Sequence, residues 1–135
     1  MSKIAILGLG TVGTGVAKVV AENARQIERK LGEPLTVKSI LVRHFKDSPY
    51  RQLMIDDFSR IERDSEIRVV VETIGGVDAA YDYTRRALEA GKHGANGYAV
   101  DIRSHNGGGY VKGGAYGKTG LRERKILQNG MGECF

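Results

Sequence analysis

Three glycines near the N-terminus have the spacing of a phosphate-binding turn. The stretch from Gly8 to Gly13 reads Gly-Leu-Gly-Thr-Val-Gly, which fits the pattern G-x-G-x-x-G. In such a turn the first glycine permits a tight bend, the second lets the backbone approach a pyrophosphate, and the third lets a helix pack closely on a strand. The N–H groups and the dipole at the helix start then face the phosphates. An ordinary glycine-rich turn has the same pattern, so the flanking segments must decide between the two interpretations.

Arg43 is the second residue whose type and position indicate chemistry. It follows the segment from Leu35 to Val42, which is rich in β-branched residues and reads as a strand. In a dinucleotide fold, the residue at the end of the second strand faces the adenine ribose and is usually Asp or Glu where the cofactor is NAD. An arginine there can bind a 2′-phosphate by bidentate hydrogen bonds, which favours NADP. The alternative is a solvated arginine at a strand end, and we expect Lys46 nearby to be solvated.

The segments on both sides of the glycine turn are those that a dinucleotide site requires. Ile4 to Leu7 is an apolar run of strand length. After the turn, apolar residues recur at helical spacing and predict one continuous helix face made of Val16, Val20, Ala24, Ile27 and Leu31. Gly32 then occupies the position where a helix end favours positive φ. The order of strand, glycine turn and helix favours nucleotide binding over an empty turn.

The next strand is predicted from Arg68 to Ile74. Its valine-rich run is typical of a strand in a parallel sheet that is covered on both faces. Glu72 interrupts this run and is either a paired structural carboxylate or a site residue. Gly75 and Gly76 follow at the carboxyl end of the strand, where ligands bind in open α/β sheets. A plain turn is the alternative for these two glycines.

Two more helices complete the predicted α/β pattern. A short helix is expected from Asp56 to Ile61, with Phe58 and Ile61 facing inward. A longer helix is expected to begin at Asp78 and to end before Gly91. Its predicted shared face consists of Tyr81, Thr84 and Leu88.

Composition predicts a soluble protein with one main domain. The 135 residues can bury a modest core, and contents of 41% hydrophobic and 27% charged residues are ordinary. No apolar run approaches the length of a membrane helix, and the segment from Ile4 to Leu7 is too short for a signal peptide, so we expect no membrane association. Cys134 is the only cysteine, which excludes an intrachain disulfide and makes a reducing cytoplasm the simplest location. The three histidines show no ligand spacing, and no metal site is expected.

The net charge of +5 suits an anionic ligand. Basic residues are spread along the chain and do not alternate with aromatic residues, so nucleic-acid binding is not expected. A solvated basic surface is the alternative, and a phosphate-rich cofactor accounts for the excess equally well.

Four stretches together resemble the NAD(P)-binding domain of homoserine dehydrogenases: KIAILGLGTVGTGVAKVV, ILVR, VVVETIGGV and ALEAGKH. The resemblance extends from about Lys3 to His93, and it implies a Rossmann-like, doubly wound, mostly parallel sheet. It also implies NADP as cofactor, with NAD as the alternative, and interconversion of homoserine and aspartate 4-semialdehyde in amino-acid biosynthesis. A homodimer is left open. The residues that the resemblance places along the cofactor are Gly8, Gly10, Thr11, Val12, Gly13, Arg43, Thr73, Ile74, Gly75 and Gly76.

After His93 the sequence departs from this family. The family continues into a strand ending Thr-Ala-Asn-Lys, whose lysine is catalytic, whereas this chain reads Gly-Ala-Asn-Gly, with Gly97 at the lysine's place. Lys92 lies nearby in sequence but not at the motif position, so the catalytic residues stay unassigned. We therefore expect an NAD(P)-binding domain over 1–93 and a divergent tail over 94–135.

The tail holds eleven of the 19 glycines and shows little periodicity. We expect an irregular, glycine-rich segment that leans on or extends the same domain, with a short helix from Leu121 to Leu127. Two functions follow from the whole sequence: the cofactor-binding portion of a homoserine dehydrogenase, or a binding module that holds NAD(P) without turnover. The chain alone is not expected to be catalytically competent.

Overall fold

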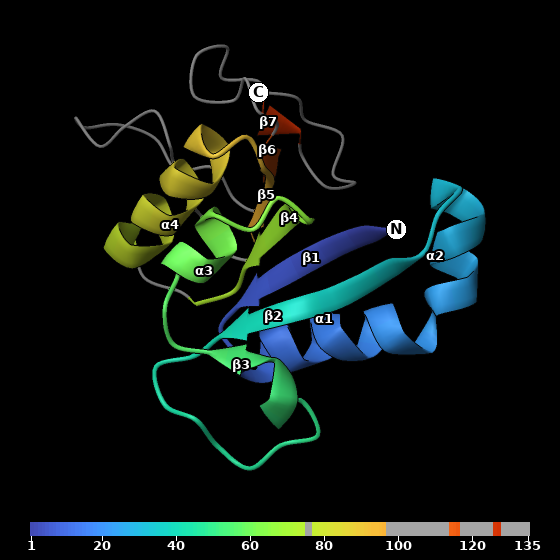
Figure 1. Ribbon diagram of the computed structural model, residues 1–135, viewed down its shortest axis with the longest axis horizontal. Helices are drawn as coiled ribbons and strands as arrows, with labels where there is room; N and C mark the ends of the chain where they lie inside the picture. Colours follow the sequence, from blue (N-terminus) through green and yellow to red (C-terminus); the bar gives the residue numbers. More distant parts are fainter. Residues whose placement is uncertain (75–76, 97–113, 117–125, 128–135) are drawn as a thin grey trace.

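A computed structural model describes residues 1–74, 77–96, 114–116 and 126–127. Its centre is one sheet with the strand order β3-β2-β1-β4-β5-β6-β7 (Figure 1). The first five strands in this order are mutually parallel, and the last two pair antiparallel. The strands are β1 (Ser2–Leu7), β2 (Leu35–Leu41), β3 (Met54–Ile55), β4 (Ile67–Glu72), β5 (His93–Asn96), β6 (Gly114–Tyr116) and β7 (Ile126–Leu127).

Helices cover both faces of the parallel part of the sheet. They are α1 (Thr11–Glu22), α2 (Ala24–Leu31), α3 (Ser59–Glu62) and α4 (Val77–Glu89), with a 3₁₀ turn at Arg51–Leu53. Figure 1 shows α1 on one side of the sheet and α3 and α4 on the other. The crossovers and the strand order 3-2-1-4-5 are those of a doubly wound, Rossmann-like fold, so the predicted fold class is confirmed.

The alternation of β1 explains the two cores. Side chains along a strand point to opposite faces in turn. Ile4 and Ile6 pack in the cluster that includes Ala17 and Val20 of α1, whereas Ala5 and Leu7 pack in the cluster that includes Phe58, Ile61 and Ala87. Because the strand is apolar on both faces, it takes the centre of the sheet, between β2 and β4.

The predicted helix after the glycine turn is helical over its length except at Asn23, where it divides into α1 and α2. At Asn23 the backbone leaves helical geometry (φ −105°, ψ 18°), and α2 starts afresh at Ala24. Both the backbone N–H and the side-chain Nδ2 of Asn23 donate to the Val19 carbonyl oxygen, each at 3.0 Å. An asparagine amide competes with the backbone in this way and interrupts a helix.

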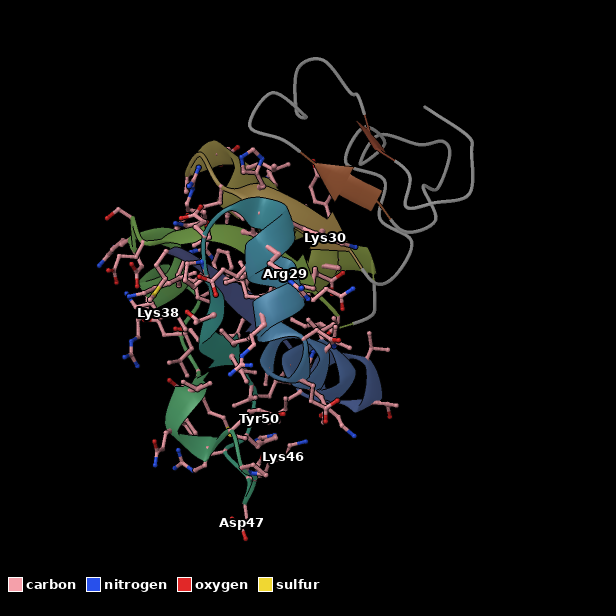
Figure 2. The ribbon with its side chains drawn as sticks, turned by 90° about the vertical axis from the view of Figure 1, so that its right-hand side faces the viewer. Arg29, Lys30, Lys38, Lys46, Asp47 and Tyr50 are labelled. Carbon is pink, nitrogen blue, oxygen red and sulfur yellow. The ribbon has the colours of Figure 1, made fainter. Side chains whose placement is uncertain are left out.

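After the break, α2 adds no fully buried residue to the core, although Ile27 is half-buried. No residue of α2 is buried, and Leu31 is 55% exposed. Arg29 and Lys30 lie on the exposed surface of this helix (Figure 2). The helix still ends as predicted, because Gly32 adopts the left-handed conformation (φ 80°).

The sheet continues past the boundary that the sequence suggested. That boundary, between 93 and 94, falls within β5, which pairs in parallel with β4. Strand β6 then pairs antiparallel with β5. The predicted helix from Leu121 to Leu127 is wrong at Ile126–Leu127, which pair with β6 instead, since tertiary pairing overrides weak local propensity. The preceding residues of that predicted helix lie outside the described residues.

Within the described ranges, no helix has the length and apolar character needed to cross a membrane.

Candidate functional site

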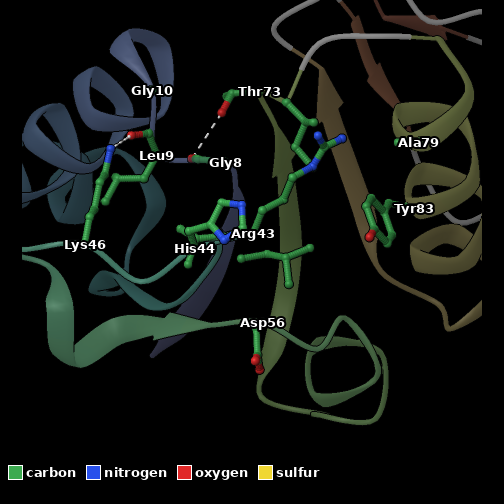
Figure 3. A pocket seen from close by; sticks show the side chains of 13 residues that line it. Gly8, Leu9, Gly10, Arg43, His44, Lys46, Asp56, Thr73, Ala79 and Tyr83 are labelled. Carbon is green, nitrogen blue, oxygen red and sulfur yellow. Dashed lines mark hydrogen bonds between the residues drawn. The ribbon is translucent and has the colours of Figure 1, made fainter.

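A cleft of ≈ 730 Å³ opens at the carboxyl ends of the central strands (Figure 3). This is the edge where open α/β sheets bind ligands, and the volume lies within the usual range for small-molecule and cofactor sites. Three parts of the chain meet there: the turn after β1, the segment after β2, and the end of β4 facing α4. The lining residues are Gly8, Leu9, Gly10, Leu41, Val42, Arg43, His44, Lys46, Asp56, Thr73, Ile74, Ala79 and Tyr83.

Two of the three glycines of the turn are required by the fold, and the third borders open space. Gly8 has φ +95°, which side chains rarely adopt, and a Cβ on Gly13 would lie 2.1 Å from the Gly8 carbonyl oxygen. Close packing of α1 on β1 therefore requires glycine at position 13. A Cβ on Gly10 would meet nothing within 4 Å, and Gly10 has an ordinary φ of −85°. Space beside Gly10 is therefore open for a ligand.

The start of α1 is electrostatically suited to an anion. Among the residues that the structure describes, no side chain caps this helix, and its first turn contains no acidic residue. Its unpaired N–H groups and the positive end of its dipole attract phosphate groups. Thr11 and Val12 begin the helix just beyond the lining residues, and both are exposed.

The segment after β2 brings basic side chains to the cleft. Arg43 and His44 lie between the glycine turn and Tyr83 (Figure 3). Lys46 does not simply extend into solvent, as the sequence suggested, because its Nζ donates to the Leu9 carbonyl oxygen at 2.6 Å. Lys46 thus ties the segment after β2 to the glycine turn. Among the described residues, neither Arg43 nor Lys46 forms an ion pair with a carboxylate.

The end of β4 forms the wall next to the glycine turn. Thr73 and Ile74 line the cleft, and Glu72 lies just behind them with 1% of its surface exposed. The Ile74 N–H donates to Glu72 Oε1 at 2.5 Å. The carboxylate of Glu72 therefore accepts a hydrogen bond from the backbone. This agrees with the interpretation of Glu72 as a paired structural carboxylate. Gly75 and Gly76, also predicted to lie along the cofactor, are outside the described residues.

Sequence reasoning missed the opposite wall of the cleft, which includes Asp56, Ala79 and Tyr83. The ring of Tyr83 lies 4.7 Å from that of Phe58, a buried residue, so it is held in place by the core. Helical spacing could have paired Ala79 with Tyr83, since residues four apart share a face. Nothing in the local sequence indicated that this face borders the cleft.

Lys92 lies at the amino edge of the sheet, opposite the cleft. It immediately precedes β5, and its Nζ donates to the carbonyl oxygens of Asp64 at 2.6 Å and Ile67 at 2.9 Å, both close to the start of β4. The side chain is buried, and burial lowers the pKa of its ammonium group. Lys92 therefore stabilises the fold by these hydrogen bonds. It lies too far from the cleft to take part in chemistry there.

A metal centre has no support in the described part of the chain. No group of three or more His, Cys, Asp or Glu side chains is arranged there to hold an ion.

Solved structures with a similar fold include two homoserine dehydrogenases. The chain matches the Staphylococcus aureus enzyme with a TM-score of 0.65 and 37% identity, covering 70% of this chain and 25% of that one. For the Thiobacillus denitrificans enzyme the TM-score is 0.63 and the identity 32%, covering 70% of this chain and 23% of that one.

Curated sequences give the same result. The homoserine dehydrogenase of Bacillus subtilis is 34% identical over 96 residues, which is 67% of this chain and 22% of that protein. That of Pseudomonas aeruginosa is 38% identical over 94 residues, which is 67% of this chain and 21% of that protein. The chain thus spans about a fifth of the length of these relatives.

The profile of the family described as "Homoserine dehydrogenase, NAD binding domain" matches residues 8–95. This range contains the glycine turn, Arg43, the end of β4 and most of β5. With the parallel sheet, the glycine turn and the cleft beside it, the match shows that this chain belongs to the homoserine dehydrogenase NAD-binding domain family.

Proposed function

We propose that this chain binds NADP in the cleft, as the cofactor-binding portion of a homoserine dehydrogenase. The observation that carries the choice of NADP is the pair of basic side chains after β2. Arg43 and Lys46 line the cleft where a fold of this type usually places an acidic residue for NAD. A guanidinium group can bind a 2′-phosphate by two hydrogen bonds, and an ammonium group adds a second positive charge.

The rest of the cleft fits a dinucleotide. Gly10 leaves open space at the backbone, and the uncapped start of α1 supplies N–H groups for a pyrophosphate. The wall formed by Thr73 and Ile74 continues from this turn along the end of β4. When bound, the nicotinamide would supply the hydride chemistry, while the protein orients the cofactor and sets its electrostatic environment.

Interconversion of homoserine and aspartate 4-semialdehyde belongs to this proposal as the reaction of the complete enzyme, with a homodimeric state and a cytoplasmic location. Its support is family membership, since the relatives are named for homoserine dehydrogenase activity. Gly97 stands where the family resemblance puts a catalytic lysine, and it lies outside the described residues. This departure favours a second reading for the isolated chain, a module that binds NADP without turnover.

Titration of the purified chain with NADP and NAD tests the cofactor assignment. We expect saturable binding of both, tighter for NADP because only NADP carries the 2′-phosphate. Equal affinities would refute the assignment to Arg43 and Lys46, and failure to bind either cofactor would refute the proposed function itself. A homoserine-dependent assay of NADPH formation then separates an enzyme from a binding module.

A further inference from the structure

The side chain of Thr73 lies at the point where β1, α1 and β4 meet. It is 6% exposed, and its Oγ1 donates to the carbonyl oxygen of Leu7 at 2.8 Å, with the carbonyl oxygen of Gly8 at 3.3 Å (Figure 3). The Thr73 backbone N–H also donates to the Leu7 carbonyl oxygen, at 3.0 Å. A hydroxyl group carries a single hydrogen, so these bonds commit it to the turn after β1.

The same oxygen touches the space around two glycines of the turn. A Cβ on Gly8 would lie 3.3 Å from Thr73 Oγ1, and a Cβ on Gly13 would lie 2.9 Å from it. The hydroxyl therefore fills the volume that the first and third glycines leave without side chains. It donates to Leu7, the last residue of β1, and lies close to Gly13 in the first turn of α1.

The backbone around Thr73 is fixed on its other side by Glu72. The Ile74 N–H donates to the buried carboxylate of Glu72 at 2.5 Å, which closes a tight local turn at the end of β4. With Thr73 N–H bonded to β1 and Ile74 N–H bonded to Glu72, the Thr73 side chain is held toward the glycine turn. Its hydroxyl is consequently directed at backbone carbonyl groups instead of at a ligand.

We propose that Thr73 is a positioning residue that acts on the pyrophosphate through the glycine turn. Its hydroxyl holds Leu7 and Gly8 in the conformation that presents the Gly10 backbone and the start of α1 to the phosphates. This inference rests on the proposed function, because it assumes that a dinucleotide occupies the cleft. It assigns Thr73 an effect on the phosphate half of the site and none on the binding of a 2′-phosphorylated adenosine.

Two ligands and two variants test this role. Thr73→Val keeps the shape of the side chain and removes the hydroxyl, whereas Thr73→Ser keeps the hydroxyl. NADP contains the pyrophosphate, and adenosine 2′-monophosphate contains the base, ribose and 2′-phosphate without it. Thr84→Val is the matched control, since Thr84 is buried (2% exposed) on α4 and does not line the cleft. Thr73→Ala replaces the valine variant if the latter does not fold.

We expect Thr73→Val to weaken NADP roughly 3- to 10-fold, the range of one lost neutral hydrogen bond, with adenosine 2′-monophosphate unchanged. Thr73→Ser should restore NADP affinity, and Thr84→Val should leave both ligands at the wild-type value. An equal loss for both ligands, or unchanged NADP affinity in a folded Thr73→Val variant, would overturn the positioning role alone. A wild-type chain that binds no NADP would overturn the proposed function together with this inference.

Discussion

Basic side chains lie at both ends of the parallel strands, the amino edge and the carboxyl edge of the sheet. At the amino edge they form ion pairs with carboxylates, whereas at the carboxyl edge they do not in the residues that the structure describes. At the amino edge, Lys3 Nζ lies 3.0 Å from Glu66, and Lys38 Nζ lies 2.5 Å from Asp64 and also contacts Glu66. At the carboxyl edge, Arg43 and Lys46 line the cleft, and neither forms an ion pair within the described ranges.

The difference shows that charge at a sheet edge indicates binding only when it is not already neutralised. At the amino edge, the carboxylates of Asp64 and Glu66 neutralise Lys3 and Lys38, and Lys92 is buried. At the carboxyl edge, Arg43 and Lys46 have no ion pair with a carboxylate in the described part of the chain, and they line the cleft with Asp56 near the uncapped start of α1. We therefore expect changes at the carboxyl edge to alter ligand binding, and changes at the amino edge to alter stability.

The largest expected effect separates cofactor binding from turnover at the carboxyl edge. The purified 135-residue chain should bind NADP but oxidise homoserine at a rate near background. It spans about a fifth of the length of its relatives, and positioning of reactants can supply roughly 7–11 kcal/mol of barrier reduction that needs a complete substrate site. Calorimetric titration measures the first property and NADPH absorbance the second. Rapid homoserine-dependent NADPH formation would contradict this prediction, and Lys92 could not explain it from the amino edge.

The next effect separates ligand space from packing space within the glycine turn. Gly10→Val should fold normally and abolish NADP binding, because the new side chain would stand in open space where the pyrophosphate meets the backbone. Gly15→Val is the matched control, since a Cβ there also meets nothing within 4 Å but Gly15 does not line the cleft. Thermal unfolding and NADP titration are the measurements. Unchanged NADP affinity in folded Gly10→Val would refute the pyrophosphate assignment.

By contrast, Gly13→Ala should reduce stability. Its Cβ would lie 2.1 Å from the Gly8 carbonyl oxygen, so α1 must move away from β1 at a cost of about 1–3 kcal/mol. An unchanged denaturation midpoint would show that the turn relaxes without penalty.

A smaller effect concerns the choice between cofactors. Arg43→Ala should weaken NADP by about 1.5–3 kcal/mol, the range of a hydrogen bond to a charged group, and should change NAD much less. Arg29→Ala on the exposed surface of α2 controls for the loss of one positive charge. Affinities of both variants for both cofactors give the answer. Equal losses for NADP and NAD would mean that Arg43 acts through general charge or packing.

The smallest effect is expected at the amino edge. Hydrogen bonds from Lys38 lower the pKa of Asp64 and contribute most to lowering that of Glu66. The folded state then binds fewer protons than the unfolded state, so this stabilisation is present above the ordinary carboxyl values and is lost as pH falls through the lowered pKa values.

Lys38→Met should therefore move the acid-unfolding midpoint to higher pH. NADP affinity at neutral pH should not change, because Lys38 lies away from the cleft. Acid titration followed by circular dichroism measures the shift. A variant with the wild-type acid profile but weaker NADP binding would reverse the proposed contrast between the edges.

Local patterns in the sequence were sufficient for the glycine turn and its flanking elements. A strand followed by G-x-G-x-x-G and a helix is a contiguous arrangement, and its reasons lie within a few residues, such as the positive φ of Gly8. Arg43 was predictable for the same reason, since it directly follows an apolar strand. The start of β5 at His93 and the pairing of Ile126–Leu127 with β6 were not, because pairing partners come from distant segments.

Some features of the candidate site also could not be predicted from local sequence patterns. No pattern around Lys46 indicates that its ammonium group reaches Leu9, and no pattern around Tyr83 places it opposite Arg43. The break at Asn23 also escaped prediction, because helical periodicity of apolar residues continues through it while a single side-chain bond interrupts the backbone.

By itself, the sequence determined the fold class, the position of the glycine turn between a strand and a helix, and the type of residue after the second strand, since each depends on local spacing and side-chain chemistry. Only the tertiary structure decided which charges remain available. Lys92 and Arg43 are both basic, yet the fold buries the first against the carbonyl groups of Asp64 and Ile67 and leaves the second in the cleft. Burial and neutralisation depend on residues that are distant in sequence and become neighbours only when the strands pair.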